Sequence, residues 1–273
     1  ANGGQHVTNA EGINVNDEDT SSVTDLDGYE ECKLALGNCI EQTLTLESKI
    51  CTHPAATFKV QLKPGVQIED ITNPPIKIPD HIDDVVVEWI CDQINKGFIQ
   101  QVDSNIYGIR MYLLPVYQNG RIRFCIDARK VNDNTIDGDQ FSMSSQGILQ
   151  HMATTGFTHI TQLDVKSAYQ CVRIEDDINF YFMFKGVAYK LNVMAFGYKS
   201  APQKFNKLMN QVLQGHEHHA INFVDNIFIF TKGTSSYHGE TVRSVVETLT
   251  VHHIPINPQK IDLHCSQMSF LGF

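Results

Sequence analysis

The sequence predicts an α+β fold in which an antiparallel sheet carries two helices on one face. From residue 157 onward, apolar strand-like stretches alternate with amphipathic stretches in the order strand, hairpin, helix, hairpin, helix, strand. Turn signals between paired apolar stretches predict hairpins, which join antiparallel strands. Apolar residues spaced three or four apart predict helices, which bury one side against the sheet.

The first part of the chain predicts a strand, a connector and a helix. The alternating stretch FKVQLKPG at 58–65 predicts a strand that ends at a Pro-Gly turn, and 73–79 predicts an extended connector. Residues 80–97 predict a helix, because Asp80 is a suitable N-cap, acids occupy the first turns and Gly97 follows the last apolar residues.

Two hairpins and a strand come next. Residues 111–129 predict a hairpin, because two apolar stretches flank an Asn-Gly pair, the strongest short turn signal. Residues 157–174 predict a strand followed by a mixed polar and apolar segment. Residues 182–191 predict a second hairpin that turns near a Lys-Gly pair.

The last third of the chain predicts two helices, a hairpin and terminal strands. Residues 200–214 predict an amphipathic helix with Pro202 in its first turn, where proline is tolerated. Residues 220–230 predict a hairpin and 239–254 a second helix, and 256–273 hold a turn and the last strands.

The composition is that of an ordinary globular protein, with 42% hydrophobic and 19% charged residues. No run of about 18 apolar residues and no signal peptide is present, so no membrane span or membrane partner is predicted. The seven cysteines form no C-x-x-C pair, which argues against a disulfide framework or a zinc knuckle and fits a reducing compartment. The stretch GHEHHA gathers His216, His218 and His219; a metal site is one interpretation, and a solvated loop is the one we favour.

The acidity of the chain lies in its first 50 residues. The formal net charge is −10, and ten acidic against two basic residues fall within 1–50. This segment is poor in large apolar residues and predicts a disordered acidic leader or linker, followed by a nearly neutral body at 51–273. A neutral body gives no bulk electrostatic argument for nucleic acid, although local basic stripes matter more. Because the chain begins with Ala and ends within an apolar pattern, we expect it to be a fragment of a longer chain such as a polyprotein.

The apolar stretch INFVDNIFIF is interrupted only by Asp225 and Asn226. An Asp-Asn pair suits a tight hairpin turn, and it also suits half of a metal site. Asp164 falls at the end of another predicted strand. Nucleotide polymerisation uses two divalent cations about 4 Å apart, and Mg²⁺ prefers oxygen ligands such as carboxylates. Asp164 and Asp225, which end or interrupt two apolar strands, could therefore bind divalent cations together.

Six stretches resemble, in order, the sequence blocks of reverse transcriptases from gypsy-type LTR retrotransposons. They are EWICDQINKGFIQ, GRIRFCIDARKVND, LDVKSAYQCVRI, MAFGYKSAPQKFNKLM, FVDNIFIF and INPQKIDL…MSFLGF. The resemblance spans about residues 51–273 and implies an RNA-directed DNA polymerase domain of a retrovirus-like Pol polyprotein. It implies the fingers and palm of a right-hand polymerase without a thumb, with approximately 80–155 mainly fingers and 156–273 mainly palm.

The resemblance also implies the residues of a catalytic site. Asp164 and Asp225 would bind two Mg²⁺ or Mn²⁺ ions together with the backbone carbonyl of Val165. The substrate-binding residues implied are Arg123 on the triphosphate, Tyr169 as a gate against a ribose 2′-hydroxyl, and Phe196 and Gly197 lining the nucleotide site. Other interpretations stay open, with Tyr169 and Phe196 as core aromatics and Arg123 as a surface charge. Asp127 and Arg129 are expected to form a structural ion pair.

The sequence departs from the family pattern at the second hairpin acid, which is Asn226 here. An amide carbonyl is neutral, and a unit charge lost about 4 Å from a cation is worth several kcal/mol even at an effective dielectric of about 20. We therefore expect loss of much of the activity. Tyr117-Gln118 also stands where a basic pair is usual, DSNIYGIR replaces S-x-S-P-x-x-S-P, and MAFG replaces MPFG.

Two classes of function follow from this mixture of matches and departures. An active domain would bind an RNA or DNA primer–template and dNTPs, beside the thumb, connection, ribonuclease H and protease regions of its polyprotein. Its expected location is intracellular, in cytoplasmic virus-like particles or in the nucleus. The alternative is a catalytically dead or co-opted reverse transcriptase fold that acts as a binding or scaffold module. A third interpretation, a metal-free α+β binding module with a coincidental Asp-Asn turn, leaves the other five blocks unexplained.

Overall fold

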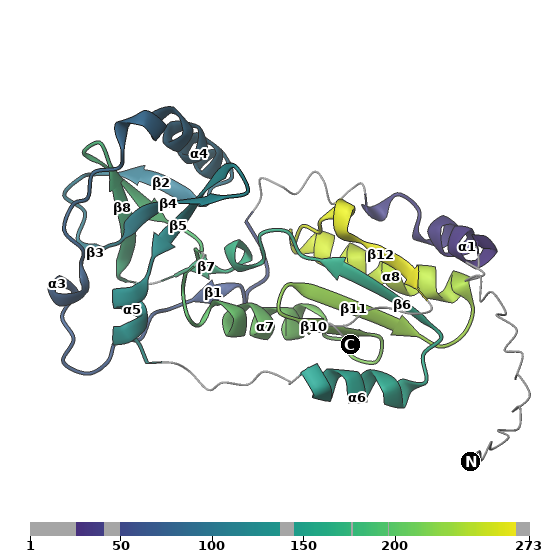
Figure 1. Cartoon of the computed structure of the whole chain (residues 1–273). Coiled ribbons are helices and arrows are strands. Elements are labelled where there is room, and N and C mark those ends of the chain that lie inside the picture. The colour runs from purple at the N-terminus through teal and green to yellow at the C-terminus, as the bar shows by residue number, and fades with distance from the viewer. Residues whose placement is uncertain (1–25, 41–49, 137–144, 176, 196, 266–273) are drawn as a thin grey trace, which may run out of the picture.

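The structure is a computed structural model that describes residues 26–40, 50–136, 145–175, 177–195 and 197–265. Its two four-stranded sheets lie in separate lobes (Figure 1). One sheet, the β8 sheet, has the strand order β2-β9-β8-β3, and the other, the β6 sheet, has the order β10-β11-β6-β12. Mixed helices and largely antiparallel sheets confirm the predicted α+β class.

The β8 sheet is antiparallel except for the pairing of β3 with β8, which is parallel. Its strands are β2 (Ile99–Val102), β3 (Gly108–Arg110), β8 (Asn179–Phe184) and β9 (Val187–Leu191). Around it lie α3 (Ile68–Ile71), the 3₁₀ turn η2 (Asp80–Ile82), α4 (Asp83–Asn95) and α5 (Arg129–Asn134). The predicted helix over 80–97 is confirmed, with Gly97 at φ +74° just beyond its end.

The hairpin of β4 (Tyr112–Gln118) and β5 (Arg121–Asp127) forms a separate two-stranded sheet. Asn119 and Gly120 connect the two strands with φ angles of 51° and 72°. Two positive φ angles are the signature of the turn that an Asn-Gly pair favours, so the predicted hairpin is confirmed.

The β6 sheet is antiparallel throughout and is built from β6 (His159–Asp164), β10 (Ala220–Phe223), β11 (Asn226–Thr231) and β12 (Asp262–Cys265). Helices α7 (Ala201–Val212) and α8 (Ser235–Val251) pack on one face, where Ile227 and Ile229 join the main core. Phe228 and Phe230 point to the opposite face, onto α6 (Ser145–Thr155). The alternation along β11 explains why both faces of this strand are apolar.

The predicted boundary between two halves near residue 155 does not separate the two lobes. Helix α6 precedes that boundary but packs against the β6 sheet. The β8–β9 hairpin follows it but belongs to the other lobe. The predicted strand over 58–65 is also shorter than expected, since β1 is only Thr57–Phe58, which pairs in parallel with β7 (Arg173–Ile174). Both the lobe to which the β8–β9 hairpin belongs and the pairing of β1 depend on long-range strand pairing, which local sequence patterns do not encode.

The prediction of a disordered leader over 1–50 is wrong for residues 26–36, which form helix α1 (Leu26–Leu36), while 1–25 and 41–49 lie outside the described residues. This helix lies against α8 and buries Cys32 and Leu36 (Figure 1). The contact is close: a Cβ atom at Gly239 of α8 would overlap the carbonyl oxygen of Cys32 and lie 2.8 Å from the Cβ of Ala35. Apolar contact with a distant helix, rather than composition, orders this acidic segment.

The described helices include none with the length and hydrophobicity needed to cross a bilayer.

A buried histidine joins α8 to the sheet. The Nε2 atom of His238 lies 2.8 Å from the hydroxyl of Thr161 on β6, and its Nδ1 atom lies 2.8 Å from the hydroxyl of Thr231 on β11.

We expect His238→Leu to lower the free energy of unfolding by about 2 kcal/mol, because it removes the imidazole from both buried hydroxyls. Urea denaturation measures this loss. His218→Leu, in an exposed loop, serves as the control, and equal losses in the two variants would contradict the expectation.

Candidate active site

The site lies at the end of the β6 sheet where β6 and β11 pair. Asp164, the last residue of β6, is the direct cross-strand partner of Asn226, the first residue of β11. The side chain of Asp164 is only 14% exposed. Because side chains at paired positions share a face, Asp164 and Asn226 project to the same side of the sheet.

The hairpin turns at Val224 and Asp225, since Phe223 pairs with Asn226. The predicted Asp-Asn turn is therefore wrong by one residue. Val224 adopts φ 57°, in the left-handed region that β-branched residues avoid, and it is exposed. Such strain persists only where the surroundings enforce it. Here the backbone N–H of Val165 donates to the carbonyl of Asp225 at 2.7 Å, which fixes the turn beside the end of β6.

The side chain of Asn226 is held between two polar groups. Its Oδ1 atom accepts a hydrogen bond from Nε2 of Gln162 at 2.9 Å, and its Nδ2 atom donates to Oδ1 of Asp225 at 3.4 Å. Gln162 lies on the same face of the sheet as Asn226, and it is the cross-strand partner of Phe228. The amide nitrogen of Asn226, rather than its oxygen, therefore faces the carboxylate of Asp225.

A lysine lies beside the other carboxylate. The Nζ atom of Lys260 is 3.3 Å from Oδ2 of Asp164. Lys260 ends the 3₁₀ turn η4 (Pro258–Lys260), and the preceding Asn257 donates its N–H to the carbonyl of Asp164 at 2.8 Å. Each carboxylate of the site thus already faces an N–H donor of the protein. Sequence reasoning missed the placement of both Gln162 and Lys260, because it depends on strand register.

Tyr169 also lies at this site. It belongs to the 3₁₀ turn η3 (Ala168–Cys171) and is half-buried, with its ring edge-on to Phe205 at 6.4 Å between centroids. Burial, and to a lesser extent the negative charge of Asp225, raises the pKa of Tyr169. The charge of Asp225 is therefore felt at Tyr169, and the role of Tyr169 as a gate against a 2′-hydroxyl stays a prediction.

Gly197 packs against the end of β5. Its φ is +115°, and a Cβ atom there would lie 2.5 Å from the carbonyl oxygen of Ile126. The amide of Asn132 spans this loop, donating to the Gly197 carbonyl at 2.7 Å and accepting from the Lys199 N–H at 2.9 Å. Only glycine fits this approach without strain. Phe196, the other residue predicted to line the nucleotide site, lies outside the described residues.

A cavity of about 540 Å³ opens between the β4–β5 hairpin and the segment that follows Asp164. Arg123 lines it from β5, together with Ser167, Gln170, Met194 and Ala195. The cavity therefore places the predicted triphosphate contact, Arg123, opposite Ser167 and Gln170, which follow Asp164 in the chain, while neither aspartate lines it. The ion pair predicted between Asp127 and Arg129 is confirmed, with Nη2 and Oδ2 2.6 Å apart, and hydrogen bonding to Arg129 lowers the pKa of Asp127.

The donor set fits a divalent cation only in part. Two carboxylates and the carbonyl of Val165, which accepts no hydrogen bond among the described residues, are hard oxygen ligands of the kind Mg²⁺ prefers. Across the part of the chain that the structure describes, however, no group of three or more His, Cys, Asp or Glu could hold a metal ion. The residue missing at this site is an acid at Asn226.

The histidines of GHEHHA do not form an alternative metal site. Nε2 of His216 lies 3.0 Å from the hydroxyl of Thr248, and Nε2 of His219 lies 3.3 Å from the hydroxyl of Tyr237. His218 is exposed.

Comparison with known families decides the identity of the fold. Residues 115–273, more than half of the chain, match the family model for reverse transcriptase (RNA-dependent DNA polymerase). The chain belongs to the reverse transcriptase family. Asp164 and Asp225 both lie within the matched residues.

Reverse transcriptase relatives are parts of polyproteins. The chain is 29% identical to the enzymatic polyprotein of Soybean chlorotic mottle virus, over 79% of this chain and 31% of the relative. It is 32% identical to the Tf2-3 transposon polyprotein of Schizosaccharomyces pombe (strain 972 / ATCC 24843), over 67% of this chain and 14% of the relative. The chain therefore spans less than a third of the length of these relatives.

Solved structures show the same reverse transcriptase fold. The foamy viral protease-reverse transcriptase in complex with RNA/DNA hybrid superposes with a TM-score of 0.70 at 18% identity, over 89% of this chain and 32% of that chain. A second structure, described as the foamy viral protease-reverse transcriptase dRH in complex with ds DNA, gives 0.62 at 19% identity, over 78% and 38%. These likenesses confirm the predicted fold class.

Proposed function

We propose that this chain is the RNA-directed DNA polymerase domain of a gypsy-type LTR retrotransposon, with nucleotidyl transfer weakened by Asn226. The observation that carries the proposal is the cross-strand placement of Asp164 beside the Val224–Asp225 turn in a reverse transcriptase fold. The similarity to a transposon polyprotein supports the retrotransposon origin. The order of the six sequence blocks supports the gypsy type.

In this proposal Asp164, Asp225 and the Val165 carbonyl hold the divalent cations, Mg²⁺ or Mn²⁺. Bound there, two such ions would activate the primer hydroxyl and neutralise the triphosphate. Tyr169, packed on Phe205 and facing Asp225, presents a rigid edge to the sugar of the nucleotide. Its fixed position is the physical basis for excluding a 2′-hydroxyl.

Arg123 and Gly197 also serve the nucleotide in this proposal. Arg123 is exposed on β5, lines the cavity and brings a permanent positive charge to the triphosphate. Gly197 permits the close backbone approach to Ile126 of β5, a residue that lines the cavity. The family resemblance assigns Phe196 to the nucleotide site together with Gly197.

The proposed partners are an RNA or DNA primer–template and dNTPs. The thumb, connection, ribonuclease H and protease regions of a longer polyprotein would act with this domain, in cytoplasmic virus-like particles or in the nucleus. The chain covers only 31% and 14% of the two polyprotein relatives, which supports the proposal that other regions of a polyprotein act with this domain.

A second function, a binding or scaffold module without catalysis, is favoured by one specific observation. Lys260 lies beside Asp164, and the amide of Asn226 donates to Asp225, so each carboxylate already has a protein partner without any cation. A carboxylate that loses its catalytic ion can be retained when the protein supplies a replacement charge.

Primer extension on an RNA template separates the two functions. With Mg²⁺ and, separately, Mn²⁺, we expect the chain to extend a primer slowly and Asp225→Ala to be at least about 100-fold slower, since it removes a cation ligand. A thumb should be appended to all variants to hold the duplex. If the chain and Asp225→Ala are equally inactive but bind the primer–template equally well, the binding module is the correct function.

A further inference from the structure

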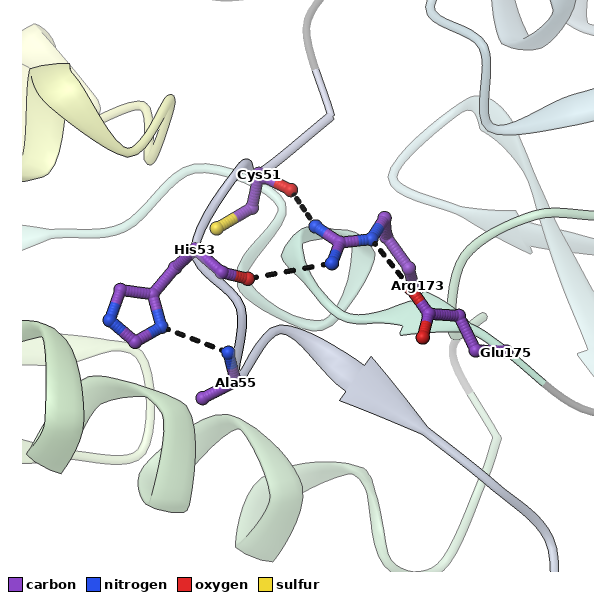
Figure 2. Close-up of polar contacts among 5 residues, drawn as sticks. All are labelled: Cys51, His53, Ala55, Arg173 and Glu175. Atoms are coloured by element: carbon purple, nitrogen blue, oxygen red, sulfur yellow. Dashed lines mark hydrogen bonds and ion pairs between the residues drawn. The ribbon is translucent and has the colours of Figure 1, made fainter.

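A short segment, Cys51–Ala55, is held by Arg173 (Figure 2) and contacts His252 at the end of α8. The guanidinium of Arg173 donates from Nη1 to the carbonyl of Cys51 and from Nη2 to the carbonyl of His53 at 3.5 Å. Its Nε atom contacts Oε1 of Glu175 at 3.3 Å. The backbone of Arg173 also donates to the carbonyl of Ala56 at 2.8 Å. Arg173 therefore fixes this segment from several directions.

The imidazole of His53 is held in its neutral form by geometry. Its Nδ1 atom accepts a hydrogen bond from the backbone N–H of Ala55 at 3.1 Å, so that nitrogen carries no proton (Figure 2). Its ring meets the ring of His252 edge-on, with centroids 4.6 Å apart. A proton taken up at Nδ1 would break the bond to Ala55 and place a cation against His252.

The charged and titratable groups that face His53 would not compensate the positive charge of its protonated ring. They are the guanidinium of Arg173 on β7, the imidazole of His252 at the end of α8 and, within its own segment, the thiol of Cys51. Burial, then His252 and then Arg173 lower the pKa of His53. Burial raises the pKa of the Cys51 thiol, so it stays uncharged. Glu175 is engaged by Arg173.

The end of α8 leads directly to the catalytic strand. The backbone N–H of Thr52 donates to the carbonyl of His252 at 3.1 Å. Beyond His252 the chain returns to β6, where Lys166 N–H donates to the Pro255 carbonyl at 2.9 Å and Asn257 N–H donates to the Asp164 carbonyl at 2.8 Å. The loop 252–257 thus connects the His53 contact to the backbone of Asp164.

We propose that His53 is a proton-sensitive positioning residue: neutral, it holds Cys51–Ala55 on the His252 end of α8, and protonated, it releases the loop that supports Asp164. This role goes beyond the proposed polymerase function and does not depend on catalysis.

The direction of the pH effect follows from the lowered pKa of His53 in the folded state. The unfolded chain takes up the proton first, near the ordinary histidine value of about 6.5. The stability contributed by neutral His53 is therefore fully present above about pH 6.5 and is lost progressively as the pH falls below it.

His53→Asn is the informative variant, because an Asn side-chain oxygen can accept the same N–H two residues on and does not titrate. Amide hydrogen exchange of Val165 and Asn257 should be compared at pH 8 and pH 5.5 after correction for intrinsic rates. We expect acid to speed the exchange in the unsubstituted protein about fivefold more than in His53→Asn, the size of one lost hydrogen bond. His218→Asn, in an exposed loop, should behave like the unsubstituted protein. Identical pH responses in the protein and His53→Asn would overturn the proposal.

A direct titration covers the case in which His53→Asn fails to fold. The NMR midpoint of the His53 ring should lie below the ordinary value in the unsubstituted protein and move upward in His252→Ala, which removes the facing imidazole. A midpoint at the ordinary value in both proteins would overturn the proposal. Neither measurement uses polymerase activity, so a failure of the His53 proposal can be distinguished from a failure of the proposed polymerase function.

Discussion

Asn226→Asp is expected to make the stability of the protein depend on divalent cations. Without a cation, the new carboxylate loses the hydrogen bond that Asn226 donates to Asp225 and repels it instead. With Mn²⁺ or Mg²⁺, three carboxylates would be available as ligands, from Asp164 on β6, Asp225 in the turn and position 226 on β11. At about 4 Å and an effective dielectric of about 20, each unit charge pair is worth about 4 kcal/mol.

The expected readout of Asn226→Asp is a melting temperature that is lower than that of the unsubstituted protein without cation and higher with about 10 mM Mn²⁺, by several degrees in each case. Primer extension should rise by at least about 100-fold in the same variant.

Gln162 keeps its donor toward position 226 in Asn226→Asp, so the strand geometry needs no change. Adding Asp225→Ala to Asn226→Asp supplies the control, because it should abolish both the cation response and the gain in extension. A melting temperature of Asn226→Asp that ignores Mn²⁺ would show that these side chains do not form a cation site.

Gly239→Ala is expected to detach helix α1 from α8. The new methyl group would occupy the position of the Cys32 carbonyl oxygen, which belongs to backbone and cannot rotate away. Overpacking of this kind costs about 1–3 kcal/mol, while the better helix propensity of alanine returns up to about 1 kcal/mol. We therefore expect a net loss that appears mainly in the α1–α8 contact.

The thiol of Cys32 reports this detachment. Cys32 is fully buried, and burial, with the charge of Glu31 second, raises its pKa to about 11. Labelling of Cys32 by a thiol reagent, followed by peptide mass spectrometry, should accelerate at least about tenfold in Gly239→Ala. The exposed Cys91 should label equally in both proteins, and Ser244→Ala on the exposed side of α8 should leave Cys32 protected. Unchanged protection of Cys32 in Gly239→Ala would show that α1 adjusts without leaving α8.

Local signals explain which parts of the fold were predictable. Asn119 and Gly120 adopt the positive φ angles that their residue types favour, and so does Gly186 in the β8–β9 hairpin. Helix α1 was not predictable, because its order depends on packing against Gly239, about 200 residues away. Local sequence carries no information about that contact.

The same contrast holds within the active site. Asp164 and Asp225 could be identified because they interrupt or end apolar strands within recognisable blocks. The position of the turn could not, because Val224 adopts a conformation that its residue type disfavours and only the pairing of Phe223 with Asn226 imposes it. Gln162 and Lys260 escaped prediction because the pairing of β6 with its neighbours brings Gln162 to Asn226 and Lys260 to Asp164.

The positions of the residues at this site depend on main-chain hydrogen bonds between β6 and β11, whereas the chemistry of the site depends on their side chains. Main-chain pairing of Asp164 with Asn226, and the bond from Val165 to the Asp225 carbonyl, hold the positions whichever polar side chains occupy them. One nucleotide change that turns an aspartate codon into an asparagine codon can therefore silence an element without unfolding its product. Under the proposed function, inactive copies of such an element would still fold and would compete for the same primer–template, and one reverse change could restore them.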